Sequence, residues 1–326
     1  MTVFVTGSTG VLGRRLVERL VARGYDVDGL VRDDAGAEVV ESRGGTPVRG
    51  DVLDHDSLVE ALTGVETVVH AATSLPVKTK PTDADWERND RVRVEGARNL
   101  VAVAGQDIDR FLFPSIVWLA RQPDGSAFDE DASRHPDRAT ASAATVEDYL
   151  RETAEAEGFD ATILRCGFFY APDAGHTRDI GESLLSRDVP IVGGGLLGRR
   201  DATLSLLHAD DAAGAFADAI DAELSGLYHV VDDEPATFAE FIEAFADRLG
   251  APSPRRIPGW LARFIAGRET VRLLTNSMPT SADRFKAATG WEPQYPTYRA
   301  GLDQVIETWR DDGTIRNTAD GYEWVG

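Results

Sequence analysis

Short apolar runs alternate along the first half of the chain with longer stretches in which apolar residues recur at helical spacing. The short runs span residues 3–5, 27–31, 65–71, 110–117 and 161–164, and the longer stretches span 11–21, 92–103 and 145–155. The short runs are apolar throughout, as is typical of strands that helices cover on both faces. This alternation predicts an α/β fold with a doubly wound parallel sheet.

The alternation becomes less regular after about residue 168, where clusters of Gly, Pro and Asp interrupt it. Residues 238–249 and 300–309 still show the helical pattern. We therefore expect one domain over residues 1–167 and a smaller α/β region over 168–326, with about 203–231 returning to the first sheet.

Acidic residues far outnumber basic ones, with 55 Asp and Glu against 34 Lys and Arg, which gives a formal net charge of −21. Only three of the cations are lysines: Lys78, Lys80 and Lys286. Such a surface repels nucleic acid and anionic lipid. It suits a protein that stays hydrated in concentrated salt, because a Debye length of roughly 3 Å at about 1 M screens the self-repulsion. We therefore expect a halophilic protein that does not bind nucleic acid.

The single cysteine, Cys166, has no partner for an intrachain disulfide, which is typical of a reducing compartment. No apolar run approaches the roughly 18 residues of a membrane-spanning helix, and no charged-then-apolar leader precedes the first run. We expect a cytoplasmic protein. The six histidines have no metal-ligand spacing, so we expect no metal site.

A glycine-rich segment, Thr6-Gly7-Ser8-Thr9-Gly10-Val11-Leu12-Gly13, directly follows the first apolar run and opens a helical pattern. In this context Gly7 permits a tight turn, Gly10 lets the backbone approach a pyrophosphate, and Gly13 lets helix and strand pack closely. The start of the helix presents unpaired N–H groups to an anion. The alternative is a glycine-rich turn without a ligand, which the flanking strand and helix disfavour.

The three-residue spacing of these glycines resembles the short-chain dehydrogenase/reductase superfamily, especially its extended and atypical branches of epimerase/dehydratase-like proteins. Six further segments resemble that family, in the same order, within roughly residues 2–300. They are Gly50-Asp51-Val52, His70-Ala71-Ala72, Gly96 with Asn99-Leu100, Leu164–Pro172, His208–Ala212 and Thr289–Pro293. The resemblance implies a dinucleotide-binding Rossmann domain over residues 1–167 and a mainly substrate-binding region over 168–326.

The resemblance also implies which residues surround the dinucleotide. They are Gly7, Ser8, Thr9, Gly10, Val11, Leu12, Gly13, Arg32, Asp51, Val52, Ala71, Ala72, Ser115, Cys166 and Phe168. Arg32 ends the second apolar run, where a guanidinium suits the 2′-phosphate of NADP. We therefore expect NADP as cofactor. Two alternatives stay open: Arg32 is a surface residue at the strand end, or Asp33 or Asp34 binds the ribose diol and makes NAD the cofactor.

In the family the chemistry rests on a Ser, a Tyr and a Lys, with the Tyr four residues before the Lys. The Tyr carries a proton to or from the substrate oxygen, and the Lys lowers the Tyr pKa and holds the nicotinamide ribose. Ser115 takes the place of the substrate-polarising serine. Family members commonly carry a Glu four residues after the Lys; with Glu147 as that residue, Ala139 and Ala143 occupy the Tyr and Lys positions.

A check that needs no alignment agrees with this register, because none of the seven tyrosines has a lysine four residues on. Two other side chains could carry a proton. Tyr170 lies near the expected nicotinamide end, and His176 begins a loop that could line the substrate cleft. For both, the more ordinary role of packing residue or loop donor is the stronger hypothesis. A third solution is a reaction that needs no strong acid, with Ser115 orienting the substrate and the nicotinamide supplying hydride.

Other segments have two interpretations each. Cys166 could sit near the nicotinamide, but a buried, inert thiol is favoured because no neighbouring Lys or His lowers its pKa. Gly198-Arg199-Arg200-Asp201 could touch substrate phosphates or form a solvated turn. Residues 255–274 form a basic amphipathic stretch that could roof the substrate cleft or contact a partner or a membrane surface. The resemblance also allows a homodimer formed through the helix at 140–155.

Two functions follow from these observations. The first is an NAD(P)-dependent oxidoreductase, epimerase or dehydratase acting on a small or nucleotide-linked carbonyl or sugar. The second is a dinucleotide-binding redox sensor or structural subunit without turnover. The glycine-rich segment supports both functions. Ser115 and the substrate region favour the first, whereas the missing Tyr and Lys favour the second.

Overall fold

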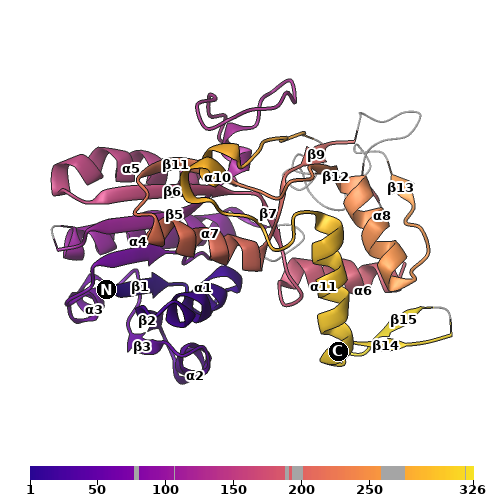
Figure 1. Ribbon diagram of the computed structural model, residues 1–326, viewed down its shortest axis with the longest axis horizontal. Coiled ribbons are helices and arrows are strands. Elements are labelled where there is room, and N and C mark those ends of the chain that lie inside the picture. The colour runs from indigo at the N-terminus through magenta and orange to yellow at the C-terminus, as the bar shows by residue number, and fades with distance from the viewer. Residues whose placement is uncertain (77–80, 106, 188–190, 193–200, 258–275, 320) are drawn as a thin grey trace.

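A computed structural model describes residues 1–76, 81–105, 107–187, 191–192, 201–257, 276–319 and 321–326 of the chain. Seven strands form the central sheet (Figure 1). In their order across the sheet they are β11 (Gly226–Val230), β6 (Asp160–Cys166), β5 (Arg110–Ile116), β4 (Thr67–His70), β1 (Thr2–Thr6), β2 (Asp26–Val31) and β3 (Thr46–Arg49). Every neighbouring pair is parallel. The predicted doubly wound parallel sheet is confirmed.

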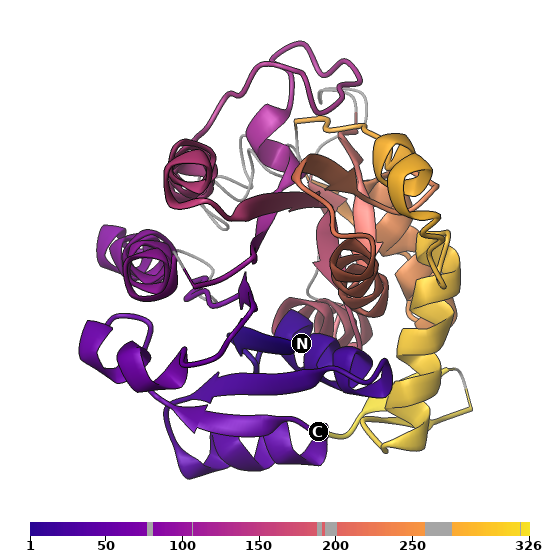
Figure 2. The ribbon, with the colours of Figure 1, turned by 60° about the vertical axis from the view of Figure 1, so that its left-hand side comes forward.

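Helices cover both faces of this sheet (Figure 2). One face carries α3 (His55–Ala61), α4 (Asp83–Ala104) and α5 (Ala141–Glu157), whose apolar side chains share one core with Phe4, Phe111 and Phe113. The other carries α1 (Val11–Ala22) and α7 (Ala209–Asp221), which pack against each other, and α2 (Asp34–Ser42) lies beside β2 and β3. Both faces of the strands are therefore buried, which explains their uniformly apolar sequences.

The remaining elements form a smaller region at the carboxyl edge of the sheet. Its strands form three pairs, β7 (Phe168–Tyr170) with β10 (Leu206–His208), β9 (Thr203–Leu204) with β12 (Ala236–Thr237), and β8 (Ile191–Val192) with β13 (Arg256–Ile257). Its helices are α6 (Gly175–Leu185), α8 (Phe238–Leu249), α10 (Asp283–Thr289) and α11 (Tyr298–Asp311), followed by the hairpin of β14 (Ile315–Asn317) and β15 (Tyr322–Trp324). Buried Trp309 of α11 stacks on Phe245 of α8 and donates its indole N–H to the Pro172 carbonyl.

The chain crosses between these two parts more than once. After β7, β8, β9 and β10 in the smaller region, α7 and β11 return to the central sheet. The sequence-based division at residues 1–167 and 168–326 stays a prediction.

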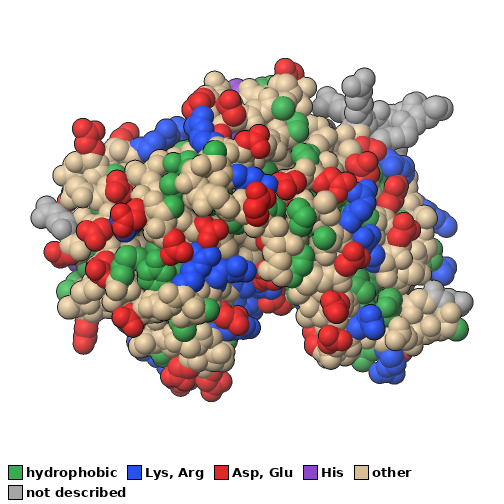
Figure 3. Space-filling view, in the orientation of Figure 1, with side chains coloured by type: hydrophobic (Ala, Val, Ile, Leu, Met, Phe, Trp, Pro, Cys, Tyr) green, Lys and Arg blue, Asp and Glu red, His purple; other side chains and the backbone are tan. Residues whose placement is uncertain are grey.

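The surface carries acidic side chains over most of the face seen in Figure 3, with arginines interspersed among them. Many of these arginines form ion pairs, as Arg248 does with Asp303 and Arg256 with Asp201. Within the described ranges, no helix has both the length and the apolar character needed to cross a bilayer.

Candidate functional site

The glycine-rich segment forms a tight loop between β1 and α1. Gly7 adopts a φ of +66°, a left-handed conformation that side chains disfavour, and its carbonyl accepts a hydrogen bond from the Gly10 amide at 2.8 Å. A Cβ atom at Gly13 would lie 2.0 Å from the Gly7 carbonyl oxygen, so only glycine permits this packing. A Cβ atom at Gly10 would meet only that oxygen, at 3.1 Å, because the other side of Gly10 is open.

The open side of this loop is one wall of a cleft of about 290 Å³ at the carboxyl edge of the sheet. From the sequence-predicted set, the cleft brings together Gly7, Thr9, Gly10, Arg32, Asp51, Val52, Ala71 and Ala72. Gly10, the N-cap of α1, makes no side-chain cap, so the first amides of this helix lack a capping partner from it. A cleft that contains a glycine-rich loop and a helix start fits a dinucleotide whose pyrophosphate lies at that helix start.

The rim of the cleft is fixed by contacts from distant parts of the chain. The Thr6 hydroxyl contacts Nδ1 of buried His70 at 2.8 Å and accepts a hydrogen bond from the Ala72 amide at 3.2 Å. The Asn99 amide donates to the Val52 carbonyl at 2.8 Å. These contacts hold the strand ends that would face the adenosine.

Six residues of the cleft wall were not singled out from the sequence: Gly36, Leu53, Thr73, Ser74, Arg88 and Val92. Arg88 and Val92 are four residues apart on α4, so they share one helix face, and Thr73 and Ser74 follow the β4 segment that was noticed. The helical spacing of Arg88 and Val92 would have suggested that these two residues share a face of α4. Only the packing of α4 on the sheet shows which face reaches the cleft.

Four of the expected loop residues, Ser8, Val11, Leu12 and Gly13, do not line the cleft. Ser8 is buried and donates its hydroxyl to the Leu30 carbonyl at 2.8 Å, which ties the loop to β2. Leu12 and Gly13 pack inward on the sheet side of α1. Val11 packs against the small cluster of Ala171, Ala174 and Ala209. Their roles in cofactor binding are therefore indirect, through the shape of the loop.

The charged residues that follow β2 differ in their contacts. Asp33 accepts a hydrogen bond from the Gly36 amide at 2.8 Å and so caps α2, and Asp34 pairs with Arg49. Arg32 is exposed and lines the cleft on the same side as Asp33. Both carboxylates that could favour NAD thus have a structural partner, whereas the guanidinium faces the cleft.

Ser115 lies in a buried polar cluster below the carboxyl edge. Its hydroxyl donates to Oε1 of Glu147 at 2.5 Å, and Arg165 donates to both carboxylate oxygens of Glu147, at 2.8 and 2.7 Å. Ser115, Glu147 and Arg165 are only 3%, 0% and 2% exposed. The cluster ties α5 to β5 and β6, and a substrate that used the Ser115 hydroxyl would compete with Glu147 for it.

The start of α5 contains the two alanines at the expected Tyr and Lys positions. Ala139 is half-buried in the turn before α5, and Ala143 is fully buried in its first turn. The turn is held by Asp137, which accepts hydrogen bonds from the Ala139 and Thr140 amides and pairs with Arg121. Neither methyl group can donate or accept a proton.

An aromatic cluster stands at the ends of β5 and β6. The rings of Trp118 and Phe168 stack with centroids 6.0 Å apart, and His176 packs edge-on against Phe168 at 5.1 Å. Nε2 of His176 lies 2.6 Å from the Phe169 carbonyl oxygen, and the buried indole N–H of Trp118 has no hydrogen-bond partner among the described residues. Although His176 as a whole is exposed, desolvation of its packed ring lowers its pKa.

Tyr170 and Cys166 are buried and do not line the cleft. Tyr170 is fully buried, with its ring edge-on to His208 and Phe241, and a Cβ atom at Gly301 would lie 2.1 Å from its hydroxyl. Burial raises the pKa of Tyr170 far above its usual value and likewise raises the pKa of the Cys166 thiol. These surroundings support the packing role for Tyr170 and the inert thiol for Cys166.

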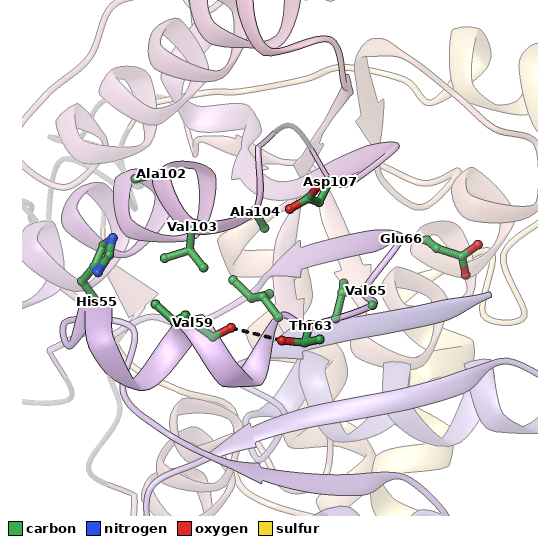
Figure 4. A pocket seen from close by; sticks show the side chains of 11 residues that line it. His55, Val59, Thr63, Val65, Glu66, Ala102, Val103, Ala104 and Asp107 are labelled. Atoms are coloured by element: carbon green, nitrogen blue, oxygen red, sulfur yellow. Dashed lines mark hydrogen bonds between the residues drawn. The ribbon is translucent and has the colours of Figure 1, made fainter.

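A larger hollow of about 630 Å³ lies elsewhere, between α3 and α4 (Figure 4). Thr63, Val65 and Glu66, which precede β4, and Asp107, which precedes β5, line it. It therefore opens at the amino edge of the sheet. Ligands of doubly wound folds bind at the carboxyl edge, so the smaller cleft is the candidate site.

Two sequence-based expectations cannot be placed. Residues 198–200 of the segment Gly198–Asp201 and residues 258–274 of the basic stretch lie outside the described residues. Arg256, at the start of that stretch, pairs with Asp201 and Glu243.

Comparison with known proteins agrees with this geometry. The model of the NAD dependent epimerase/dehydratase family matches residues 3–230. The chain is 34% identical over 310 residues to the 3-diazoavenalumate denitrifying reductase of a Streptomyces species, which covers 93% of this chain and 99% of that protein. It is 26% identical to the 2-alkyl-3-oxoalkanoate reductase of Shewanella oneidensis, over 87% of this chain and 76% of that protein.

Solved structures share the fold over nearly the whole chain. The UDP-glucose 4-epimerase of Thermus thermophilus, in complex with NAD, superposes with a TM-score of 0.78 at 24% identity, covering 95% of this chain and 99% of that one. A human epimerase family protein with NADPH gives a TM-score of 0.76 at 19% identity, covering 94% and 99%. Similar structures thus hold one or the other dinucleotide.

Proposed function

Because the chain belongs to the NAD-dependent epimerase/dehydratase family, we propose that it is an NADP(H)-dependent reductase that transfers hydride to a small aromatic substrate. In the proposed reaction, no Tyr–Lys pair transfers a proton. The observation that carries it is a contrast: the cleft contains the glycine-rich loop and the residues expected around the adenosine, whereas the start of α5 has Ala139 and Ala143.

Reduction is favoured over epimerisation by two lines of support. Two relatives that align over most of this chain are both named as reductases. Epimerases and dehydratases on sugars must remove and return protons, which is work for an acid–base pair. Alanines at the two positions cannot do it, so a one-step reduction suits this site better.

The name of the Streptomyces relative suggests which electrophile is compatible with such a site. That name describes a denitrifying reductase acting on a diazo compound. NADPH, when bound, supplies a hydride. In the net reduction of an aryldiazonium group, the hydride electron pair forms the new C–H bond, the C–N bond breaks, and dinitrogen leaves with that bond pair. No proton is consumed, so we propose an aryldiazonium group as the reacting group.

The aromatic cluster supports a flat aromatic ring as the rest of the substrate. Trp118 and Phe168 stand at the ends of β5 and β6, where the nicotinamide end of a dinucleotide in the cleft would reach. A substrate ring can stack on such a surface. The unpartnered indole N–H of Trp118 would then donate to a polar substituent. In this proposal, the Ser115 hydroxyl bonds to Glu147 and stabilises the end of β5.

We expect the protein to oxidise NADPH in the presence of benzenediazonium but not of acetophenone. A single-turnover assay in molar KCl follows NADPH absorbance, while mass spectrometry follows benzene and dinitrogen. The rate with benzenediazonium should exceed the enzyme-free rate by at least about 100-fold, the lower end of ordinary catalytic factors. Reduction of acetophenone at the usual enzyme rates of about 1–10³ s⁻¹ would contradict the proposal. NADPH binding without turnover of either probe would favour the redox sensor instead.

We also propose NADP rather than NAD as the cofactor, because Arg32 faces the cleft while Asp33 and Asp34 have other partners. Charge-assisted hydrogen bonds to the 2′-phosphate predict a preference for NADP of about 10- to 100-fold. Arg32→Ala should remove it, measured as the ratio of the two dissociation constants. Arg91→Ala, an exposed arginine on α4 paired with Glu95, is the control. If Arg32→Ala leaves this ratio unchanged, the role of binding the 2′-phosphate would pass to Arg88.

A further inference from the structure

One arginine is buried without the partners that a buried cation normally has. Arg93 of α4 is 4% exposed, and its Nε and Nη1 atoms have no hydrogen-bond partner among the described residues. Burial lowers the pKa of Arg93 to about 10, so the guanidinium still carries its charge at neutral pH. An uncompensated buried charge is costly and is retained where it serves a purpose.

The surroundings within the protein do not satisfy this guanidinium. The nearest opposite charge is Asp90, one turn earlier on α4, but its Oδ2 accepts a hydrogen bond from Arg138 at 2.6 Å and its Oδ1 is itself unpartnered. The carbonyl of Arg93 lies 3.1 Å from Nε2 of His70, and the lowered pKa of that buried histidine, about 4, keeps it uncharged. Among the described residues, therefore, no anionic or acceptor group forms a hydrogen bond with Nε or Nη1 of Arg93.

Side chains near Arg93 also have buried polar atoms without a hydrogen-bond partner among the described residues. Asn89, one turn before Arg93 and fully buried, accepts from the Ser74 amide at 3.1 Å, but its Nδ2 is unpartnered. Ser74 lines the cleft. Across on α5, the buried Ser142 hydroxyl also lacks a partner. Asn89 and Arg93 present N–H donors, so the missing group at this place is an acceptor.

The helix packing brings Arg93 level with the two alanines of α5. Helices α4 and α5 pack side by side (Figure 2) and run in the same direction, because each follows a strand of the parallel sheet. The ion pair of Asp90 with Arg138 sets their relative height. Arg93 follows Asp90 by three residues and Ala143 follows Arg138 by five, so this ion pair places Arg93 near the height of the first turn of α5. Side chains tilt toward the helix start, which for α4 is the carboxyl edge with the cleft.

We propose that Arg93 supplies, from α4, the cation that binds the hydroxyls of the nicotinamide ribose, in place of the lysine missing from α5. The small methyl group of Ala143 leaves room for the longer guanidinium. The ribose oxygens are the acceptors that Arg93 and Asn89 lack within the protein. The inference rests on the proposed dinucleotide binding, and it makes Arg93 a binding residue that leaves proton transfer unassisted, because a guanidinium does not give up its proton.

Calorimetric titration with NADPH and with 2′,5′-ADP separates the two halves of the cofactor. The second probe carries the adenosine half and lacks the nicotinamide ribose. Arg93→Met should weaken NADPH binding by about 10- to 100-fold and leave 2′,5′-ADP binding unchanged. Arg91→Met, on the exposed face of the same helix, should change neither. Arg93→Met with Ala143→Lys should recover affinity for NADPH, because the lysine restores a cation from α5.

The melting temperature of the cofactor-free protein distinguishes binding from a structural role. A cation that is kept for a ligand destabilises the free protein, so Arg93→Met should melt at the same temperature as wild type or higher. Lower melting with unchanged NADPH affinity would overturn the inference, as would equal weakening of both probes. Arg93→Lys, which keeps the charge, should retain intermediate affinity for NADPH. If both Arg93→Met and Arg93→Lys fail to fold, Arg93 has a structural role and the inference is overturned. Failure of wild type to bind either probe would refute the proposed function itself.

Discussion

Replacing Gly10 by valine is expected to abolish binding of NADPH while leaving the fold intact. A Cβ atom at Gly10 approaches only the Gly7 carbonyl, at 3.1 Å, so the loop needs a small adjustment at most. The methyl groups of valine, however, would occupy the open side of Gly10, where the cleft brings a pyrophosphate against the start of α1. We expect affinity to fall by at least about 100-fold, or roughly 2.8 kcal/mol.

Titration calorimetry in molar KCl measures this loss, and far-UV circular dichroism should be unchanged. Gly326→Val is a control, because Gly326 does not line the cleft and a Cβ atom there meets nothing within 4 Å. Gly10→Ala should give a smaller loss, since it adds a single methyl group. Wild-type affinity in Gly10→Val would mean that the dinucleotide does not use this loop.

Replacing Glu147 by alanine is expected to be the most destabilising single change near the site. Glu147 is fully buried and accepts hydrogen bonds from Ser115 and, through both oxygens, from Arg165. Its removal leaves the buried guanidinium of Arg165 uncompensated, which costs about 3–5 kcal/mol. The melting temperature should fall by roughly 4–7 °C.

Thermal and urea unfolding of cofactor-free protein measure the effect. Glu152→Ala, an exposed position on the same helix, should stay within about 0.5 kcal/mol of wild type. The double change Glu147→Leu with Arg165→Met should regain much of the loss, because it removes both charges together. A small effect of Glu147→Ala alone would show that water compensates Arg165, because the other charged partner of Glu147, Arg134, is itself a cation.

The parts of the site that depend on neighbouring residues along the chain could be predicted from the sequence. The loop from Gly7 to Gly13 needs only a strand, a turn and a helix start in succession, and the structure places Gly7 in the left-handed conformation that its role requires. Arg32 follows directly from the end of β2. The missing Tyr–Lys pair is a matter of spacing within the sequence.

Other parts depend on which segments pack together, and no local pattern contains that information. Arg88 and Val92 belong to the cleft because one face of α4 reaches the β4 end. The sequence suggested that Ser115 binds substrate. In the structure its hydroxyl donates a hydrogen bond to Glu147, 32 residues away, and Glu147 also pairs with Arg165.

By itself, the sequence determined the parallel sheet, the dinucleotide loop and the composition of the start of α5, because apolar periodicity and glycine spacing act between near neighbours in the chain. Only the tertiary structure decided which buried polar groups have partners. Glu147 on α5 and Arg165 on β6 form an ion pair, whereas Nε and Nη1 of Arg93 have no hydrogen-bond partner in the part of the chain that the structure describes. The physical reason is that a buried polar group must be satisfied by whatever the fold brings beside it, and that neighbour comes from another segment of the chain.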